Sequence, residues 1–142
     1  MRLDRVFLDT AYIQGLLSER DQYHAIAQAL FPHIRSAREV WVTEAVLTEV
    51  GNALSSSHRT LAVRFIRLCY QTANIRVVSV DANLLQKALH LYERHQDKTW
   101  GLTDCISFVV MAEKGLTDAA TADHHFTQAG YRALLLNGDW TR

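Results

Sequence analysis

Four carboxylates, Asp9, Glu49, Asp104 and Asp123, lie where an apolar run meets polar sequence or at the border of an amphipathic helical pattern. They are spread over almost the whole chain, so only folding can bring them together. Together they would repel one another strongly unless a divalent cation neutralised them. Carboxylate oxygens favour a hard cation, Mg²⁺ or Mn²⁺, over zinc. Such an ion activates water and offsets charge building on a phosphate, so the pattern predicts a metal-dependent phosphodiesterase site.

Length and composition predict a single globular domain over residues 1–142, with 49% hydrophobic and 21% charged residues. The formal net charge is zero, which counts against a plainly basic nucleic-acid binder. Without the four candidate acids, however, 15 basic side chains face 11 acidic ones. We expect neither a signal peptide nor a membrane span, because no apolar run is long enough. Both cysteines lie in apolar helical patterns, so we expect free thiols and a cytoplasmic protein.

Short β-rich runs alternate with helical patterns along the chain. The runs predict strands over 5–9, 39–43, 75–80, 118–121 and 131–136. Helices are predicted over 10–17, 21–35, 81–95, 103–115 and 124–130, with two more starting after Thr43 and at Ser57. This alternation predicts an α/β domain with a mainly parallel central sheet.

Topology gives a reason for the acids to meet. Ligands of open parallel sheets bind beyond the carboxyl ends of the strands, where the following helices begin. Asp9 closes the first predicted strand, and Asp123 follows the fourth. Asp104 comes directly after Thr103, the predicted N-cap, where the helix dipole favours an ionised carboxylate. Glu49 lies further along its helix and reaches this edge only if that helix leans across it.

Each acid also has a purely structural interpretation. Asp9 and Asp123 could simply cap the helices that follow them, and Asp104 could complement a helix dipole. Glu49 could be a solvated border residue. Taken singly these interpretations are favoured, whereas the four acids together favour a shared site.

Three neighbouring side chains could support such a site. Thr10 and Thr103 could hydrogen-bond the acids or a metal-bound water, and each could equally cap a helix. His125 could contact phosphate or carry a proton, as could its neighbour His124. For the histidines a structural role is favoured, because adjacent helix positions point in different directions.

Four blocks of this sequence together resemble PIN domains, in order and in approximate spacing. They are 6–12 (VFLDTAY), 43–50 (TEAVLTEV), 100–108 (WGLTDCISF) and 121–126 (TADHHF), with Gly130 following the last. The resemblance covers essentially the whole chain. It is strongest to small stand-alone PIN proteins, including toxins of the VapC kind from toxin–antitoxin pairs.

The resemblance implies a Rossmann-like three-layer α/β/α sandwich and a metal-dependent endoribonuclease. It assigns metal binding, by Mg²⁺ or Mn²⁺, to Asp9, Glu49, Asp104 and Asp123. It also implies an RNA substrate, a cognate antitoxin protein and a homodimer.

Three alternatives remain open. The chain could be a stand-alone PIN-type RNA-processing nuclease, or an RNA-binding or scaffolding module without catalysis. A phosphoacceptor domain of receiver type would also use acids and Mg²⁺. It would need adjacent acids after the first strand and an acceptor Asp after the third, where this chain has Asp9-Thr10 and Ser79-Val80-Asp81. This last alternative is therefore disfavoured.

Overall fold

The computed structural model describes residues 3–141 and has a five-stranded sheet at its centre. Every pair of neighbouring strands is parallel, as the sequence predicts. The spatial order β3-β2-β1-β4-β5 places the first strand in the middle. The strands are β1 (Arg5–Leu8), β2 (Glu39–Thr43), β3 (Ile75–Val78), β4 (Asp118–Ala120) and β5 (Arg132–Ala133).

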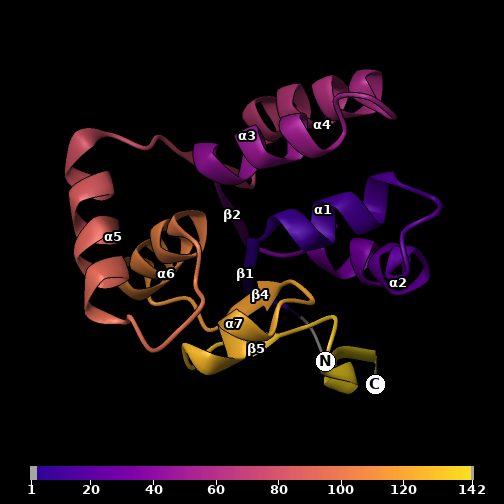
Figure 1. The fold of residues 1–142 in the computed structure, drawn as a ribbon. Helices are drawn as coiled ribbons and strands as arrows, with labels where there is room; N and C mark the ends of the chain where they lie inside the picture. The colour runs from indigo at the N-terminus through magenta and orange to yellow at the C-terminus, as the bar shows by residue number, and fades with distance from the viewer. Residues whose placement is uncertain (1–2, 142) are drawn as a thin grey trace.

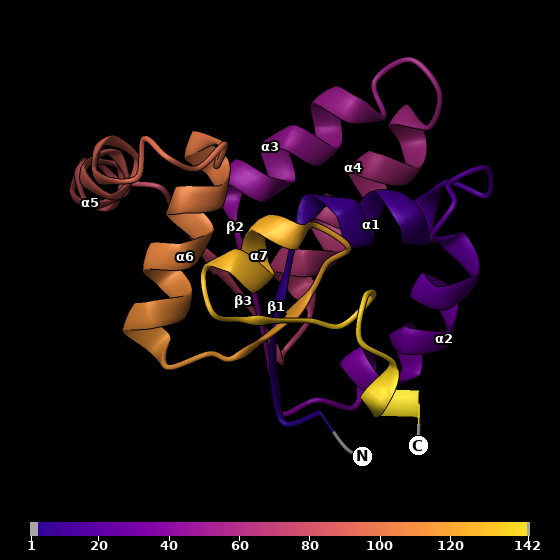
Figure 2. The same cartoon turned by 60° about the horizontal axis from the view of Figure 1, so that its bottom comes forward.

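Helices cover both faces of the sheet, which confirms the predicted three-layer α/β/α sandwich (Figures 1 and 2). One layer contains α1 (Thr10–Leu17), α2 (His24–Arg35) and α4 (Arg59–Gln71), and the other contains α5 (Ala82–Arg94) and α6 (Leu102–Lys114). The remaining elements are α3 (Glu44–Ala53), α7 (His124–Gln128) and the 3-10 helix Gly138–Thr141. Helix α3 contacts α1, α4 and α6, and so joins the two layers at the carboxyl edge of the sheet.

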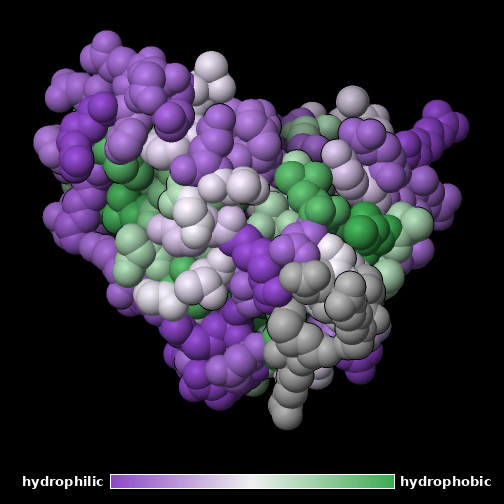
Figure 3. Space-filling view, turned by 90° about the horizontal axis from the view of Figure 1, so that it is seen from below, coloured by the Kyte–Doolittle hydropathy of each residue, from purple (hydrophilic) through white to green (hydrophobic). Residues whose placement is uncertain are grey.

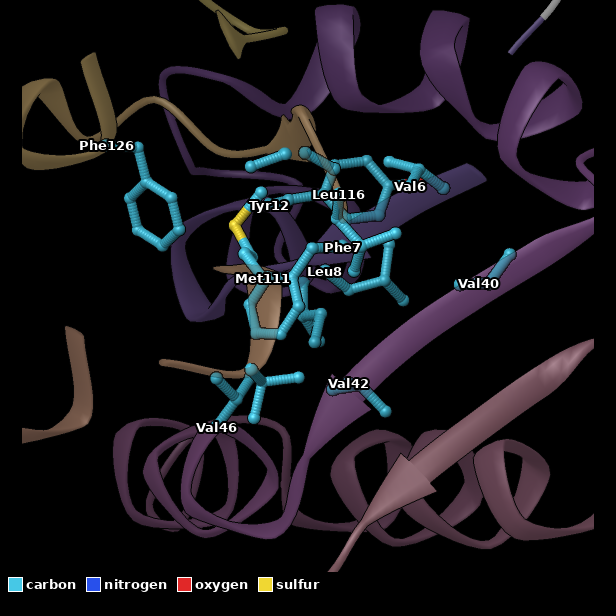
Figure 4. Packing of buried hydrophobic residues seen from close by; sticks show 14 of the residues in the cluster. Val6, Phe7, Leu8, Tyr12, Val40, Val42, Val46, Met111, Leu116 and Phe126 are labelled. Carbon is cyan, nitrogen blue, oxygen red and sulfur yellow. The ribbon is translucent and has the colours of Figure 1, made fainter. Parts of the chain in front are cut away.

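The central strand is buried on both faces, which explains its uninterrupted apolar sequence. Val6, Phe7 and Leu8 are each at most 2% exposed. Figure 4 shows these side chains packed with residues from other elements, including Val46 of α3 and Met111 of α6. The strand β1, which ends at the candidate site, therefore lies in the buried core of the molecule.

Aromatic rings fill the space between α6 and α7. The ring centroid of Phe108 lies 4.9 Å from that of Phe126 and 5.0 Å from that of Trp100. Phe126 is fully buried and Trp100 is 8% exposed. Both residues therefore belong to the core.

The strand predicted over 39–43 matches β2, whereas the other four strand predictions run past the ends of the observed strands. The last strand was expected over 131–136, but β5 contains only two residues. The chain turns there, because the N–H groups of Leu136 and Asn137 both donate to the carbonyl of Ala133 at 3.0 Å. Leu134 and Leu135 are nevertheless buried, so their apolar character reflects core packing rather than a longer strand.

Two helix starts were also predicted incorrectly on the first layer. Helix α2 begins at His24 rather than Asp21, whose Oδ1 accepts the Tyr23 N–H at 2.8 Å in the preceding turn. Helix α4 begins at Arg59 rather than Ser57. The Thr43 cap of α3 is confirmed, since Thr43 Oγ1 accepts the Val46 N–H at 3.1 Å.

The predicted cap Thr103 is wrong. Helix α6 begins at Leu102 and its N-cap is Gly101. The Gly101 N–H donates to Asp104 Oδ2 at 3.1 Å, so the carboxylate closes the first turn and Thr103 lies inside it. The predicted end at Gly115 is confirmed by its left-handed φ of 66°.

The surface is largely hydrophilic, with hydrophobic residues gathered in separate patches on the face shown in Figure 3. Within residues 3–141, none of the helices has both the length and the apolar character required to cross a bilayer.

Candidate metal centre

Asp9 and Asp123 meet because their strands are neighbours. Leu8 of β1 pairs with Ala120 of β4, so both chains leave the sheet side by side. The Thr121 hydroxyl donates to Asp9 Oδ2 at 2.7 Å and also accepts the Asp123 N–H at 3.0 Å. Thr121 thus connects two acids that lie more than a hundred residues apart in the sequence.

Asp104 approaches from the first turn of α6, and His125 links it to Asp123. His125 Nδ1 lies 3.0 Å from Asp104 Oδ2 and 3.3 Å from Asp123 Oδ1. The His125 N–H also donates to Asp123 Oδ1 at 2.9 Å. The imidazole of His125, on the short helix α7, therefore contacts both Asp123, which caps α7, and Asp104 in the first turn of α6.

Glu49 reaches the cluster from α3. The Thr10 hydroxyl donates to Glu49 Oε1 at 2.7 Å, and Thr10 directly follows Asp9. Glu49 also lines a shallow groove of about 390 Å³ together with Thr103. Helix α3 therefore brings Glu49 to the residue next to Asp9, while Asp9, Asp104 and Asp123 are linked through Thr121 and His125.

Burial and mutual repulsion disfavour ionisation of Asp9 and Asp104. Asp9 is 4% exposed, and this burial, opposed by the Thr121 hydrogen bond and reinforced by the charges of Asp104 and Asp123, raises its pKa to about 7. Burial also raises the pKa of Asp104, and the charge of Asp123 acts in the same direction. Hydrogen bonds from Gly101 and His125 oppose that rise.

The cluster lacks basic partners other than histidine. Within the described part of the chain, none of the four carboxylates pairs with a Lys or Arg side chain. Glu49, Asp104 and Asp123 each accept their hydrogen bonds from described residues on one oxygen only. Their second oxygens are therefore available to a cation, and this donor set suits Mg²⁺ or Mn²⁺.

A second group of possible metal ligands shares Asp123 with the four predicted acids and adds two histidines. Asp123, His124 and His125 each offer a ligand atom within 4.8 Å of the others. Nitrogen ligands suit transition metals better than Mg²⁺. However, His125 Nδ1 already faces two carboxylates and the His124 side chain is 70% exposed. We therefore favour the oxygen set, with His125 beside it.

Comparison with known families identifies the domain. The model of the PIN domain family matches residues 6–130, which is most of the chain. The protein belongs to the PIN domain family.

The relatives of this PIN domain include toxins. It is 30% identical over 129 residues to the 23S rRNA-specific endonuclease VapC20 of Mycobacterium tuberculosis, covering 89% of this chain and 95% of that protein. The crystal structure of VapC20, described as a Sarcin-Ricin loop cleaving toxin, matches with a TM-score of 0.79 at 26% identity, with the same coverage. VapBC-1 from nontypeable Haemophilus influenzae matches with a TM-score of 0.60 at 17% identity, over 97% of this chain and 99% of that one, a likeness of fold alone. The predicted similarity to ribonucleases of toxin–antitoxin systems is thereby confirmed.

Sequence reasoning missed three residues of this PIN domain site. They are Thr121, which bonds Asp9; Gly101, which caps α6; and Thr99, whose Oγ1 lies 3.0 Å from His125 Nε2. Thr121 carried a usable signal, because it is a polar residue at the end of a short apolar strand two positions before Asp123. Thr99 carried none, since a loop hydroxyl before a helix is common.

Proposed function

We propose that this PIN domain is a metal-dependent endoribonuclease that hydrolyses RNA phosphodiester bonds. Asp9, Glu49, Asp104 and Asp123 would hold Mg²⁺ or Mn²⁺. The observation that supports this most is the linkage of acids that follow β1, begin α6 and follow β4 through Thr121 and His125, with no Lys or Arg of residues 3–141 paired to them. Such a cluster is costly when empty and is relieved by a cation.

The side chains of this site have separable tasks in that reaction. A bound divalent ion would activate water and offset charge on the phosphate. Thr121 fixes one oxygen of Asp9, and Gly101 fixes one oxygen of Asp104, so both carboxylates are already oriented. Thr10 does the same for Glu49, the most exposed of the four. The raised pKa of Asp9 means that a cation must displace a proton there at neutral pH and below.

The test is cleavage of RNA by the purified protein, with 23S ribosomal RNA as the first substrate because VapC20 is named for it. We expect cleavage with Mg²⁺ or Mn²⁺ and none with EDTA. Asp104→Asn should lower the rate by about 10²-fold or more, because one ligand charge is lost. Asp97→Asn, an exposed acid of the preceding loop, is the matched control and should leave the rate unchanged.

Metal-independent cleavage, or full activity of Asp104→Asn, would refute the assignment. RNA binding without any cleavage would instead favour the non-catalytic module.

We further propose that an antitoxin protein covers an apolar groove on the first layer. The groove measures about 320 Å³ and runs between α1, α2 and α4. Leu68 of α4, which is 51% exposed, lines it. Phe31 of α2, which is 36% exposed, lines it as well. A protein segment with apolar side chains would cover these exposed residues.

Leu68→Asp is expected to weaken the complex with the protein encoded beside this gene about 100-fold, because it buries a charge in an apolar contact. Val63→Asp is the control: Val63 lies on the same helix, is 41% exposed and does not line the groove. Titration of each purified variant with the partner measures the difference. Equal affinity of the two variants would exclude this groove. The homodimer expected from the resemblance stays a prediction, to be measured by light scattering.

A further inference from the structure

The imidazole of His125 lies between two of the proposed metal ligands and is held from its far side by Thr99. We propose that His125 is a positioning residue that sets the separation and orientation of the Asp104 and Asp123 carboxylates, and that Thr99 fixes the direction of its ring. This inference rests on the proposed function, since it concerns the same site.

Every polar atom of the His125 side chain, and the His125 backbone N–H, has a hydrogen-bonding partner in this arrangement. Nδ1 lies 3.0 Å from Asp104 Oδ2 and 3.3 Å from Asp123 Oδ1, while Nε2 lies 3.0 Å from Thr99 Oγ1. The backbone N–H donates to Asp123 Oδ1 at 2.9 Å. The side chain is only 16% exposed. The ring therefore has one orientation that satisfies all of its neighbours.

Hydrogen-bond chemistry fixes the state of Nδ1. Both of its neighbours are carboxylate oxygens, which accept hydrogen bonds, so Nδ1 carries a hydrogen. The Thr99 hydroxyl can either donate to Nε2 or accept from it. Thr99 therefore keeps the ring in place whether the imidazole is neutral or protonated, and the Nδ1–H group always points between the two acids.

Two side-chain contacts join α7 to the loop that precedes α6. One is the Thr99–His125 contact, and in the other Trp100 Nε1 donates to Gln128 Oε1 at 3.0 Å. Helix α7 contains only five residues, too few to be stable without tertiary contacts. The position of Asp123 relative to Asp104 consequently depends on these two links and on the burial of Phe126.

Two substitutions separate the roles of the ring nitrogens. In His125→Asn the amide NH₂ can occupy the place of Nδ1 but cannot reach Thr99. In His125→Gln the longer side chain can reach Thr99 but has no donor at the place of Nδ1. We expect His125→Gln to raise the Mn²⁺ dissociation constant about 10–100-fold, the usual effect of losing a hydrogen-bond partner of a metal ligand. His125→Asn, which keeps a donor at the place of Nδ1 and loses only the Thr99 contact, should weaken Mn²⁺ binding about fivefold.

Metal affinity is measured by calorimetry on RNA-free protein, so the readout does not depend on cleavage. Thr99→Val should weaken Mn²⁺ binding about fivefold, and Thr99→Ser should restore it, because only the hydroxyl is needed. In metal-free wild-type protein, ¹⁵N NMR of the imidazole should show the hydrogen on Nδ1. Wild-type affinity of His125→Gln, or a hydrogen absent from Nδ1, would overturn the inference.

His124→Gln distinguishes this role from direct ligation by the histidines. If Asp123, His124 and His125 bound the ion themselves, His124→Gln would weaken Mn²⁺ binding as strongly as His125→Gln does. That result would refute the inference. We expect a change of less than about twofold, because His124 Nδ1 lies 3.7 Å from Asp123 Oδ1, beyond hydrogen-bond distance, and the His124 ring otherwise packs beside the ring of His125, with 4.5 Å between the centroids.

Asp104→Asn distinguishes this failure from failure of the proposed function. If Asp104→Asn binds Mn²⁺ as tightly as wild type, the carboxylate site itself is refuted, and the inference with it. If Asp104→Asn loses Mn²⁺ while His125→Gln retains it, only the positioning role is refuted.

Discussion

Asp9→Asn is expected to lower RNA cleavage by about 10³-fold or more while making the metal-free protein more stable at pH 8. The loss of activity follows from removing the most buried ligand charge, since metal stabilisation of the transition state amounts to several kcal/mol. The fold should survive, because an Asn oxygen can still accept the Thr121 hydroxyl that now bonds Asp9. Cleavage assays over a range of protein concentrations measure the first effect.

The gain in stability follows from the raised pKa of Asp9. Its pKa is about 7 in the folded protein, against an ordinary value of 3.8. The folded state therefore binds more protons than the unfolded state between about pH 4 and 7, so the contribution of Asp9 to stability falls as pH rises through that window. Above pH 7 the buried charge costs about 2–4 kcal/mol, a cost that Asn does not have.

Urea unfolding of both proteins in EDTA tests this effect. The difference in free energy of unfolding should be largest at pH 8 and small near pH 4. Glu93→Gln, an exposed change on α5, is the control and should show no such trend. A difference that is the same at both pH values would contradict the buried charge as its source.

Mn²⁺ affinity is expected to rise about 100-fold between pH 5 and pH 7 and to level off above. Because the pKa of Asp9 is about 7, a cation binding below that pH must displace the Asp9 proton. Each pH unit then changes the apparent affinity about tenfold. The raised pKa of Asp104 acts in the same direction.

Calorimetry in buffers of different ionisation enthalpy measures this linkage directly. Binding at pH 6 should release about one proton per ion, and binding at pH 8 almost none. Asp9→Asn should remove most of the pH dependence along with much of the affinity. An affinity independent of pH in the wild-type protein would contradict the displacement of an Asp9 proton by the metal ion.

The sequence was sufficient to predict where Asp9 and Asp123 lie, because both follow strands of one parallel sheet. Strand ends are local features, and the sheet converts them into spatial neighbours. The apolar run of β1 and the alternation of strands and helices were likewise readable. The match of the PIN domain family to residues 6–130 confirms the resemblance drawn from the four blocks.

Other features depended on tertiary packing that no local pattern encodes. The contact between Glu49 and Thr10 requires a particular tilt of α3, which is set by the helices that α3 touches. Thr103 was wrongly assigned as the cap because Asp104 closes the first turn on Gly101 instead. For His125 the helical periodicity argued against a site role, yet a loop threonine and two acids surround its ring.

The interior position of β4 in the sheet has a consequence for biosynthesis. β4 lies between β1 and β5, although it begins only at residue 118 of 142. A nascent or prematurely terminated chain that stops before Thr121 lacks both the hydroxyl that orients Asp9 and the carboxylate of Asp123. The proposed cluster of acidic groups is therefore complete only once residue 123 has been translated, long after Asp9 has left the ribosome.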